Sequence, residues 1–399
     1  MEGEKIEKDS TEGNFNDEND AAYSSTLTPP SAQPLPTLPF DLIVEILCRL
    51  PVKLLMQFRC ICKSWNSLIS DSKFAKQHLH MSTTLGLHSF HYNYSVRKYF
   101  LMSYPLDSVS AILSTNVAQL QYAPNSIDEY SRSFYFVGSC NGMLCLAHNH
   151  CDCYFLVWNP SIRKFKELPP FQKKSELSID IKMTHGFGYD HVNDKYKVVV
   201  VLHYDVDILP GEVSLFDKTE VKVYTFGTDF WKSIKEFPFD GVPVESGKFV
   251  SGTINWLASK HRKRNGPCFI VSFDLEDESY QEILMPDYGE VDAYDLSLGV
   301  LRDSLCMISD HDVWVMKEYG NKDSWTKLFT VSDKCYAYIN AMCMFEDDQV
   351  LIEYRTRRYW KKKLIVYDPR NDTFKFTMFE NENSYDQEIC VESLISPWS

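Results

Sequence analysis

The sequence has no hydrophobic run long enough to cross a membrane. A membrane-spanning helix needs about 18–20 consecutive apolar residues, whereas the longest aliphatic run, Val198–Leu202, has the length of one strand. The N-terminus is acidic and polar, which argues against a secretory signal. Without such a signal the twelve cysteines are expected to be reduced thiols, so we expect a soluble protein of the cytoplasm, the nucleus or both.

An excess of positive charge is also missing. The formal net charge is −14 over 399 residues, which argues against a general nucleic-acid binder, since such proteins are normally basic. The charge is unevenly spread, because residues 1–33 carry eight acids and two bases while residues 34–80 carry three acids and six bases. A basic segment of this kind would attract an acidic partner.

Composition and periodicity divide the chain into three regions. Residues 1–33 are rich in acidic and small polar residues and are predicted to be a disordered tail, because they cannot bury enough apolar surface to offset the entropy of ordering. Residues 34–80 are predicted to form three or four short helices. Residues 81–399 lose the helical period and are predicted to be all β, which makes the whole an α+β multidomain protein.

The helical region has a broad apolar stripe. Leu38, Leu42, Ile43, Ile46, Leu47 and Leu50 follow helical spacing, Pro39 suits a first helical turn, and Pro51 ends this helix and can open the next. A second series contains Leu54, Leu55, Phe58, Ile61, Cys62, Trp65, Leu68 and Ile69. So short a segment cannot enclose a stable core unaided. Part of the stripe is therefore expected to be covered by the next domain or by another protein.

The β region contains an internal repeat. Its first unit is a hairpin, found at residues 134–147, 185–201, 249–258, 297–309 and 341–354, and Asn141-Gly142 in the first copy is a strong turn signal. Its second unit is a strand, a polar turn and an aromatic residue, and it often ends in an apolar residue followed by proline. It is found at residues 156–169, 221–238, 270–286, 313–329 and 364–379. Successive hairpin turns are roughly 44 to 59 residues apart, in the range of kelch-like repeats.

Two hairpins per repeat supply the four strands of a propeller blade. Five blades are visible, and the aromatic segment at residues 87–106 could hold a sixth. The sequence thus predicts a kelch-like β-propeller. A two-sheet sandwich is the alternative architecture, although it would not need the repeat.

Both regions resemble a known family. Residues 38–74, LPFDLIVEILCRLPVKLLMQFRCICKSWNSLISDSKF, resemble an F-box over its whole length. The later motifs GSCNGMLCL, LVWNPSIRKFKELP, GFGYDHVNDKYKVV, INWLA and CVESLISP resemble the F-box-associated domain of plant F-box/kelch-repeat proteins, a family that includes the S-locus F-box proteins.

The resemblance implies a non-catalytic substrate receptor of an SCF-type ubiquitin ligase. The F-box would bind a Skp-type adaptor and, through it, a cullin and a RING subunit, while the β domain would hold a target protein. The adaptor-binding residues that the F-box match implies are Leu38, Pro39, Leu42, Ile43, Ile46, Leu47, Leu50, Pro51, Leu54 and Phe58. Cys62 and Trp65 are expected to brace the helices from within.

Two basic clusters are candidate target contacts or nuclear-import signals. These are KHRKR at residues 260–264 and RTRRYWKKK at residues 355–363, and a solvated loop is the simpler interpretation of either. The second cluster mixes basic and aromatic residues, which dominate the energetics of protein interfaces. The candidate target contacts are therefore Arg355, Arg357, Arg358, Tyr359 and Trp360.

Other patterns have structural explanations. GSCNG at residues 138–142 matches a nucleophile-elbow spacing, but a strand follows it and Asn-Gly already explains a turn. The possible zinc ligands Cys145, His148, His150, Cys151 and Cys153 are too cramped for a tetrahedral site. Cys60-x-Cys62 is expected to pack within helices, and the tryptophans of the repeat (Trp158, Trp231, Trp256, Trp314 and Trp325) are expected to pack between blades.

Two other functions compete with the ligase subunit. One is an F-box protein that binds the adaptor outside an active ligase, and the other is an enzyme on a propeller scaffold. The enzyme would need a convergent set of ligands or a base–nucleophile pair, and the sequence offers none beyond the weak patterns above. We therefore assign no catalytic residue, no metal and no cofactor, and expect neither nucleic-acid nor membrane binding.

Overall fold

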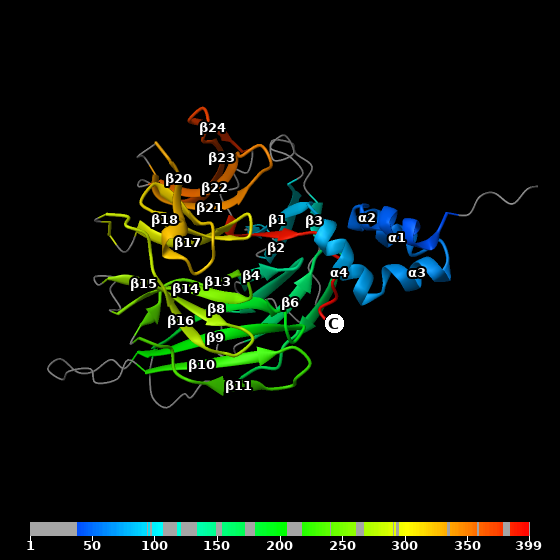
Figure 1. Ribbon diagram of the computed structural model, residues 1–399, viewed down its shortest axis with the longest axis horizontal. Helices are drawn as coiled ribbons and strands as arrows, with labels where there is room; N and C mark the ends of the chain where they lie inside the picture. Colours follow the sequence, from blue (N-terminus) through cyan, green and yellow to red (C-terminus); the bar gives the residue numbers. More distant parts are fainter. Residues whose placement is uncertain are drawn as a thin grey trace, which may run out of the picture. The chain divides into compact units, whose positions relative to one another are not determined.

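A computed structural model of the chain gives its architecture (Figure 1). The structure describes residues 38–93, 95, 98–106, 118–120, 134–148, 154–171, 180–205, 218–239, 241–260, 267–289, 291–292, 295–332, 336–356, 359–377 and 384–398. The chain divides into two compact units, Met1–Ile43 and Val44–Ser399, and the division falls within the first helix. Within the described ranges no helix is long and apolar enough to cross a membrane.

Four short helices lie between residues 40 and 81, as the sequence predicted. They are α1 (Phe40–Cys48), α2 (Val52–Phe58), α3 (Lys63–Ile69) and α4 (Ser72–Met81). Pro51 separates α1 from α2 and precedes the first helical residue of α2, a position where its missing N–H is harmless. Asp71 caps α4, because its carboxylate accepts hydrogen bonds from Lys73 N and Phe74 N.

The rest of the described chain is built from antiparallel strands in six sheets. Five sheets follow one another along the chain. They are β4 (Phe134–Cys140), β5 (Met143–His148), β6 (Phe155–Asn159) and β7 (Lys164–Glu167); β8 (Asp180–Asp190), β9 (Lys195–Asp205), β10 (Lys218–Thr225) and β11 (Trp231–Ile234); β12 (Val242–Pro243), β13 (Lys248–Val250), β14 (Thr253–Ser259), β15 (Cys268–Asp274) and β16 (Tyr280–Ile283); β17 (Leu296–Leu301), β18 (Ser304–Ser309), β19 (Asp312–Met316), the short 3₁₀ helix η2 (Lys322–Ser324) and β20 (Trp325–Thr330); and β21 (Tyr336–Met344), β22 (Val350–Thr356), β23 (Tyr359–Asp368) and β24 (Thr373–Phe376).

The sixth sheet joins the two ends of the β region. Its order is β25 (Ser384–Val391), β1 (Leu85–Asn93), β2 (Lys98–Pro105) and β3 (Ala118–Leu120), so the strand nearest the C-terminus pairs with the first strand of the chain. The innermost strands of successive sheets are neighbours, with β25 beside β4, β4 beside β8 and β17 beside β21. The domain is therefore a six-bladed propeller. The five predicted repeats and the sixth at residues 87–106 are confirmed, and the two-sheet sandwich is wrong.

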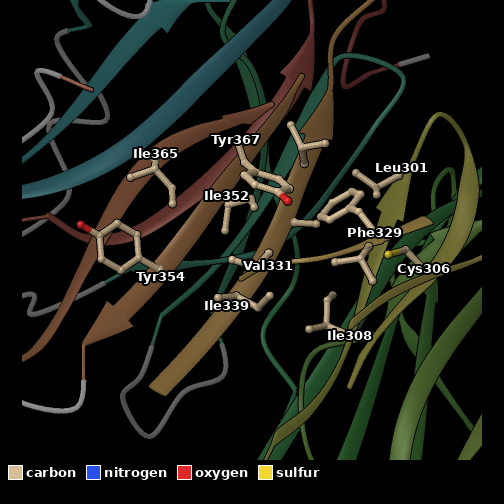
Figure 2. Close-up of a cluster of buried hydrophobic side chains, with 13 residues drawn as sticks. Leu301, Cys306, Ile308, Phe329, Val331, Ile339, Ile352, Tyr354, Ile365 and Tyr367 are labelled. Atoms are coloured by element: carbon tan, nitrogen blue, oxygen red, sulfur yellow. The ribbon is translucent and has the colours of Figure 1, made fainter. Parts of the chain in front are cut away.

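Buried apolar clusters lie between neighbouring blades. One such cluster joins the β17–β20 blade to the β21–β24 blade, and Figure 2 shows its side chains converging from both. Cys306 and Ile308 come from β18, while Ile352 comes from β22 and Ile365 from β23. Burial of side chains of this kind contributes about 1.5–3 kcal/mol each. Blade-to-blade packing is therefore a main source of the stability of the propeller.

Tryptophans reinforce the same contacts. Each of two indoles donates a hydrogen bond to the blade that precedes its own. Trp231 Nε1 donates to Pro169 O at 2.6 Å, and Trp325 Nε1 donates to Leu284 O at 2.9 Å. Trp256 donates to His185 O at 3.3 Å and is fully buried. The prediction that these three indoles pack between blades is confirmed.

A buried asparagine fastens the C-terminal segment to the β4–β7 blade. Asn159 Nδ2 lies 3.0 Å from Ser393 O, 3.1 Å from Ser393 Oγ and 2.7 Å from Ile395 O, and it is fully buried. Ser393 Oγ in turn donates to Asn141 O at 2.8 Å. Gly142 has a φ of +81°, and a Cβ there would lie 2.1 Å from Ser393 Oγ. The three motifs GSCNG, WNP and SLISP thus meet at one place, where they close the ring.

Candidate protein-binding surfaces

The first surface begins at the start of α1. Pro39 O accepts hydrogen bonds from Leu42 N at 3.1 Å and Ile43 N at 3.2 Å, which sets the first turn. Leu38, Phe40 and Leu42 are exposed large apolar side chains, and Leu42 is 46% exposed. Pro39 is also exposed, whereas Ile43 is half-buried. Exposed apolar side chains this close together are typical of a binding site.

The continuation of α1 and α2 has the same character. Ile46 is 51% exposed and Leu54 is 38% exposed, while Leu47 between them is only 2% exposed. Leu47 therefore belongs to the core of the helical segment, with Leu55, Ile69 and Phe74. Of the remaining predicted adaptor-binding residues, Pro51 is exposed and Leu50 and Phe58 are half-buried.

The turn between α2 and α3 differs from the prediction. Cys62 was expected to brace the helices from within, but Cys60 and Cys62 are both exposed. The reason is that α2 ends at Phe58, so the helical period that placed Cys62 on an inner face does not continue through the turn. Trp65 does pack as expected, with its ring edge-on to Phe58 and the ring centroids 5.4 Å apart.

The second surface is the channel of the propeller. The innermost strands line a cavity of about 1270 Å³, which contains Ser139, Lys248, Tyr338, Asp386 and Glu388. Ser139 Oγ lies 2.9 Å from Glu388 Oε1 and 2.6 Å from Ile389 O. Burial raises the pKa of Glu388, the neighbouring carboxylates raise it further, and Lys248 opposes them. The channel thus carries charged and polar side chains among apolar ones and is large enough for a peptide side chain. Sequence patterns could not identify it, because its residues come from strands far apart in the chain.

Neither weak catalytic pattern gains support. Asn141 and Gly142, with φ of 52° and +81°, form the β4–β5 hairpin turn, as predicted. Cys140 is buried, and burial raises the pKa of its thiol, which is the opposite of what a nucleophile needs. Burial also raises the pKa of the Cys145 thiol. His150, Cys151 and Cys153 lie outside the described residues.

The candidate target contacts are only partly within the described chain. Arg355 lies in β22, and its guanidinium carbon is 5.4 Å from the centre of the Tyr338 ring, a cation–π distance. Arg357 and Arg358 lie outside the described residues, as do residues 261–264 of the other basic cluster; of Tyr359 and Trp360 only the backbone, in β23, is described. Both clusters connect the second strand of a blade to its third, at β14–β15 and β22–β23. In a propeller such connections lie on one face of the ring of blades.

Comparison with known proteins identifies the family. An F-box domain model matches residues 35–77, and a model described as the F-box associated beta propeller domain matches residues 95–397. The chain therefore belongs to the F-box proteins that carry an F-box-associated β-propeller domain.

Its relatives include plant F-box proteins. The chain is 30% identical to the F-box/kelch-repeat protein At3g23880 of Arabidopsis thaliana over 376 residues, which covers 90% of this chain and 96% of that protein. It is 28% identical to the F-box protein CPR1 of the same plant over 392 residues, which covers 90% of this chain and 89% of the relative. The predicted membership of the plant F-box/kelch family is confirmed.

Proposed function

We propose that this chain is the target-recognition subunit of an SCF-type ubiquitin ligase in the cytoplasm or the nucleus. Its F-box binds a Skp-type adaptor, which links it to a cullin and a RING subunit, and its propeller holds the target protein. The observation that carries the proposal is the exposed apolar surface on F-box helices that have their own buried core, formed by Leu47, Leu55, Ile69 and Phe74. Such side chains are stabilised when a partner covers them.

The adaptor contact is made by the exposed and half-buried members of the predicted set. Ile46 and Leu54 present apolar surface from α1 and α2, and Leu42 is one helical turn before Ile46 in α1. Leu38, Pro39, Ile43, Leu50, Pro51 and Phe58 complete the contact, while Leu47 supports it from beneath. The basic character of residues 34–80 favours an acidic adaptor through electrostatic steering.

The receptor performs no covalent chemistry in this proposal. It holds the target beside the ubiquitin-loaded enzyme and so converts a bimolecular transfer into one between tethered partners. A tether of this kind raises the effective concentration of the target to about the millimolar range. The position of the target, rather than an acid, a base or a metal on this chain, then determines the rate.

Ile46→Asp combined with Leu54→Asp is expected to weaken adaptor binding at least about a hundredfold, because two carboxylates would be buried without partners in the interface. Both positions are exposed in the free chain, so the variant should fold normally. The check is co-expression with a Skp-type adaptor, size-exclusion chromatography and calorimetric titration.

The matched control is Val192→Asp with Phe230→Asp. These two side chains are also exposed and apolar but lie in turns of the propeller, so adaptor binding should be unchanged. Unaltered binding by the Ile46/Leu54 variant, or failure of the folded wild-type chain to bind any Skp-type adaptor, would refute the proposed function.

Two alternatives make different predictions. An F-box protein that acts outside a ligase would bind the adaptor yet fail to promote ubiquitin transfer in a reconstituted assay with cullin and RING subunit. An enzyme on the propeller would need a reactive constellation, and among the described residues no group of three or more His, Cys, Asp and Glu side chains could hold a metal ion.

Target binding is proposed for the face that carries Arg355. Arg355→Glu is expected to reduce several-fold the recovery of proteins that co-purify with the chain, because a stacked guanidinium suits acidic partners. Quantitative mass spectrometry of the co-purified proteins provides the measurement. Adaptor recovery serves as the internal control, and an unchanged set of partners would rule this residue out as a target contact.

A further inference from the structure

Two exposed thiols on the F-box, those of Cys60 and Cys62, are not part of the proposed adaptor contact. Of the nine cysteines among the described residues, seven are buried, and only Cys60 and Cys62 are exposed. Both lie in the three-residue turn that follows α2 or directly after it, separated by Ile61. Since the buried thiols are shielded from solvent, this pair is the part of the described chain where an external oxidant can reach a thiol.

The surroundings of Cys62 favour the reactive thiolate. Its Sγ lies 3.3 Å from Ser64 Oγ, and this hydrogen bond, followed by those from the backbone N–H groups of Trp65 and Ser64, holds the pKa of the Cys62 thiol below its usual value. Arg59 and Lys63 add positive charge nearby in the chain. Burial has the opposite effect on Cys140 and raises the pKa of that thiol. Thiolates rather than thiols attack peroxides, so Cys62 is the favoured nucleophile.

Cys60 is placed to react with an oxidised Cys62. Residues two apart in sequence have Cα atoms at most about 7 Å apart, and the Cα separation in a disulfide is about 4.4–6.8 Å. The turn is tightened by hydrogen bonds from Cys60 N to Gln57 O and from Ile61 N to Phe58 O, both 3.0 Å. The exposure of both sulfurs leaves them free to rotate towards each other.

We propose that Cys60 and Cys62 form a peroxide-sensitive thiol pair in the F-box. The Cys62 thiolate attacks one oxygen of hydrogen peroxide, the O–O bond breaks, and the departing hydroxide takes a proton to leave as water, giving a sulfenic acid. The Cys60 thiol then attacks the sulfenic sulfur, forming the disulfide and releasing a second water. Two thiols thus lose two electrons to one peroxide molecule.

Oxidation would act on the proposed adaptor surface. The turn lies between Phe58 and Trp65, whose ring centroids are 5.4 Å apart, and Phe58 belongs to the proposed adaptor contact. Closing a disulfide across Ile61 pulls the Cys62 sulfur away from Ser64 Oγ, and we expect the resulting change in the turn to shift Phe58 relative to Trp65. This regulatory consequence rests on the proposed function, whereas the thiol chemistry does not.

Mass spectrometry tests the chemistry without any adaptor. The full chain is treated with hydrogen peroxide, alkylated with N-ethylmaleimide under denaturing conditions and cut after lysine, which yields the peptide Leu54–Lys63 with Cys60 and Cys62 as its only cysteines. In the wild type this peptide should lose both alkyl groups and two hydrogens, while the peptide that contains Cys48 stays alkylated. Cys62→Ser should leave Cys60 alkylated, and Cys60→Ser should leave a sulfenic acid on Cys62 that dimedone traps.

Ser64→Ala provides the matched control for the environment of Cys62. It removes the side-chain hydrogen bond but keeps both thiols, so oxidation of the pair should slow by about three- to tenfold. Oxidation of buried Cys48 as fast as that of Cys62, or an unoxidised Leu54–Lys63 peptide, would overturn the thiol pair.

Adaptor titration then tests the regulatory consequence. Peroxide treatment should weaken adaptor binding at least tenfold, dithiothreitol should restore it, and the Cys60→Ser/Cys62→Ser variant should bind equally well with and without peroxide. An oxidised chain that binds as tightly as the reduced one would overturn regulation. A reduced chain that does not bind would instead refute the proposed function, and the mass spectrum would still decide the thiol chemistry.

Discussion

Asn159→Asp is expected to lower the free energy of unfolding of the propeller by about 3–5 kcal/mol, although the two side chains have nearly the same shape. The amide nitrogen lies 3.0 Å from Ser393 O and 2.7 Å from Ile395 O. An aspartate would place an acceptor against these carbonyls and bury a charge there. The substitution therefore replaces attractive contacts between residue 159 and the C-terminal segment with repulsive ones.

Asp368 supplies the matched control. It ends the third strand of its blade, as Asn159 does, and both accept a hydrogen bond from the backbone two residues on: Ser161 N to Asn159 Oδ1 at 2.8 Å and Arg370 N to Asp368 Oδ1 at 3.0 Å. Asp368→Asn keeps this acceptor and should change stability by less than about 1 kcal/mol. Asp368 and Asn159 thus accept the same kind of backbone hydrogen bond in their own blades. Of the two, only Asn159 also holds the C-terminal segment.

Urea unfolding of the full chain measures the difference, and hydrogen exchange locates it. Faster exchange should appear first in β25, because this strand depends on the closure that Asn159 secures. Equal midpoints for Asn159→Asp and wild type, or exchange that rises evenly over all blades, would contradict the assigned role.

The repeat architecture could be predicted because short-range sequence patterns specify the strands and turns of each blade. Alternating strands and turn signals such as Asn141-Gly142 are properties of neighbouring residues, and the predicted hairpins coincide with observed ones such as β4–β5 and β17–β18. The pairing of β25 with β1 could not be predicted in this way, because it joins residues such as Leu87 and Ile389 that are about 300 positions apart. Nothing in a local pattern specifies which distant strand will supply the missing edge.

The helical region shows a different limit. Helical spacing predicts which residues share one apolar face of a helix. It does not show which of them pack in the core of the segment and which remain exposed for a partner. Ile46 and Leu47 are adjacent members of one predicted stripe, yet the first is 51% exposed and the second 2%. Likewise, the end of α2 at Phe58 removed Cys62 from the predicted inner face. The packing of the neighbouring helices determines which side is covered, as where the His78 ring of α4 hydrogen-bonds to Leu50 O at 2.9 Å.

Lys197→Met is expected to destabilise the propeller by about 3–5 kcal/mol at neutral pH, because it leaves the buried Asp190 carboxylate without its cation. Lys197 Nζ lies 3.4 Å from Asp190 Oδ2 and 3.3 Å from Glu278 Oε1, and it donates to Leu275 O. The Asp190 side chain is fully buried. Lys197 and Asp190 belong to the β8–β11 blade and Glu278 to the next one, so the ion pairs also join two blades.

The pH dependence distinguishes this ion-pair network from simple packing. Burial acts to raise the pKa of Asp190, but hydrogen bonds from Asn193 and the charge of Lys197 outweigh it, so the pKa lies below the ordinary value; the pKa of Glu278 is likewise lowered, against burial, by Lys232 and Lys197. A carboxyl whose pKa is lower in the folded state stabilises the protein above its unfolded pKa, about 4, and loses that contribution as the pH falls through the folded pKa.

The wild type should therefore lose stability steeply below about pH 4, whereas Lys197→Met, whose Asp190 has a higher pKa, should lose less. The stability difference between the two proteins should be largest at neutral pH and shrink on acidification. Urea unfolding at several pH values measures it. Lys182→Met, a change at an exposed lysine of the same blade for which the described contacts include no ion pair, serves as the control. A stability difference that stays constant with pH would mean that Lys197 acts through its aliphatic chain and not through its charge.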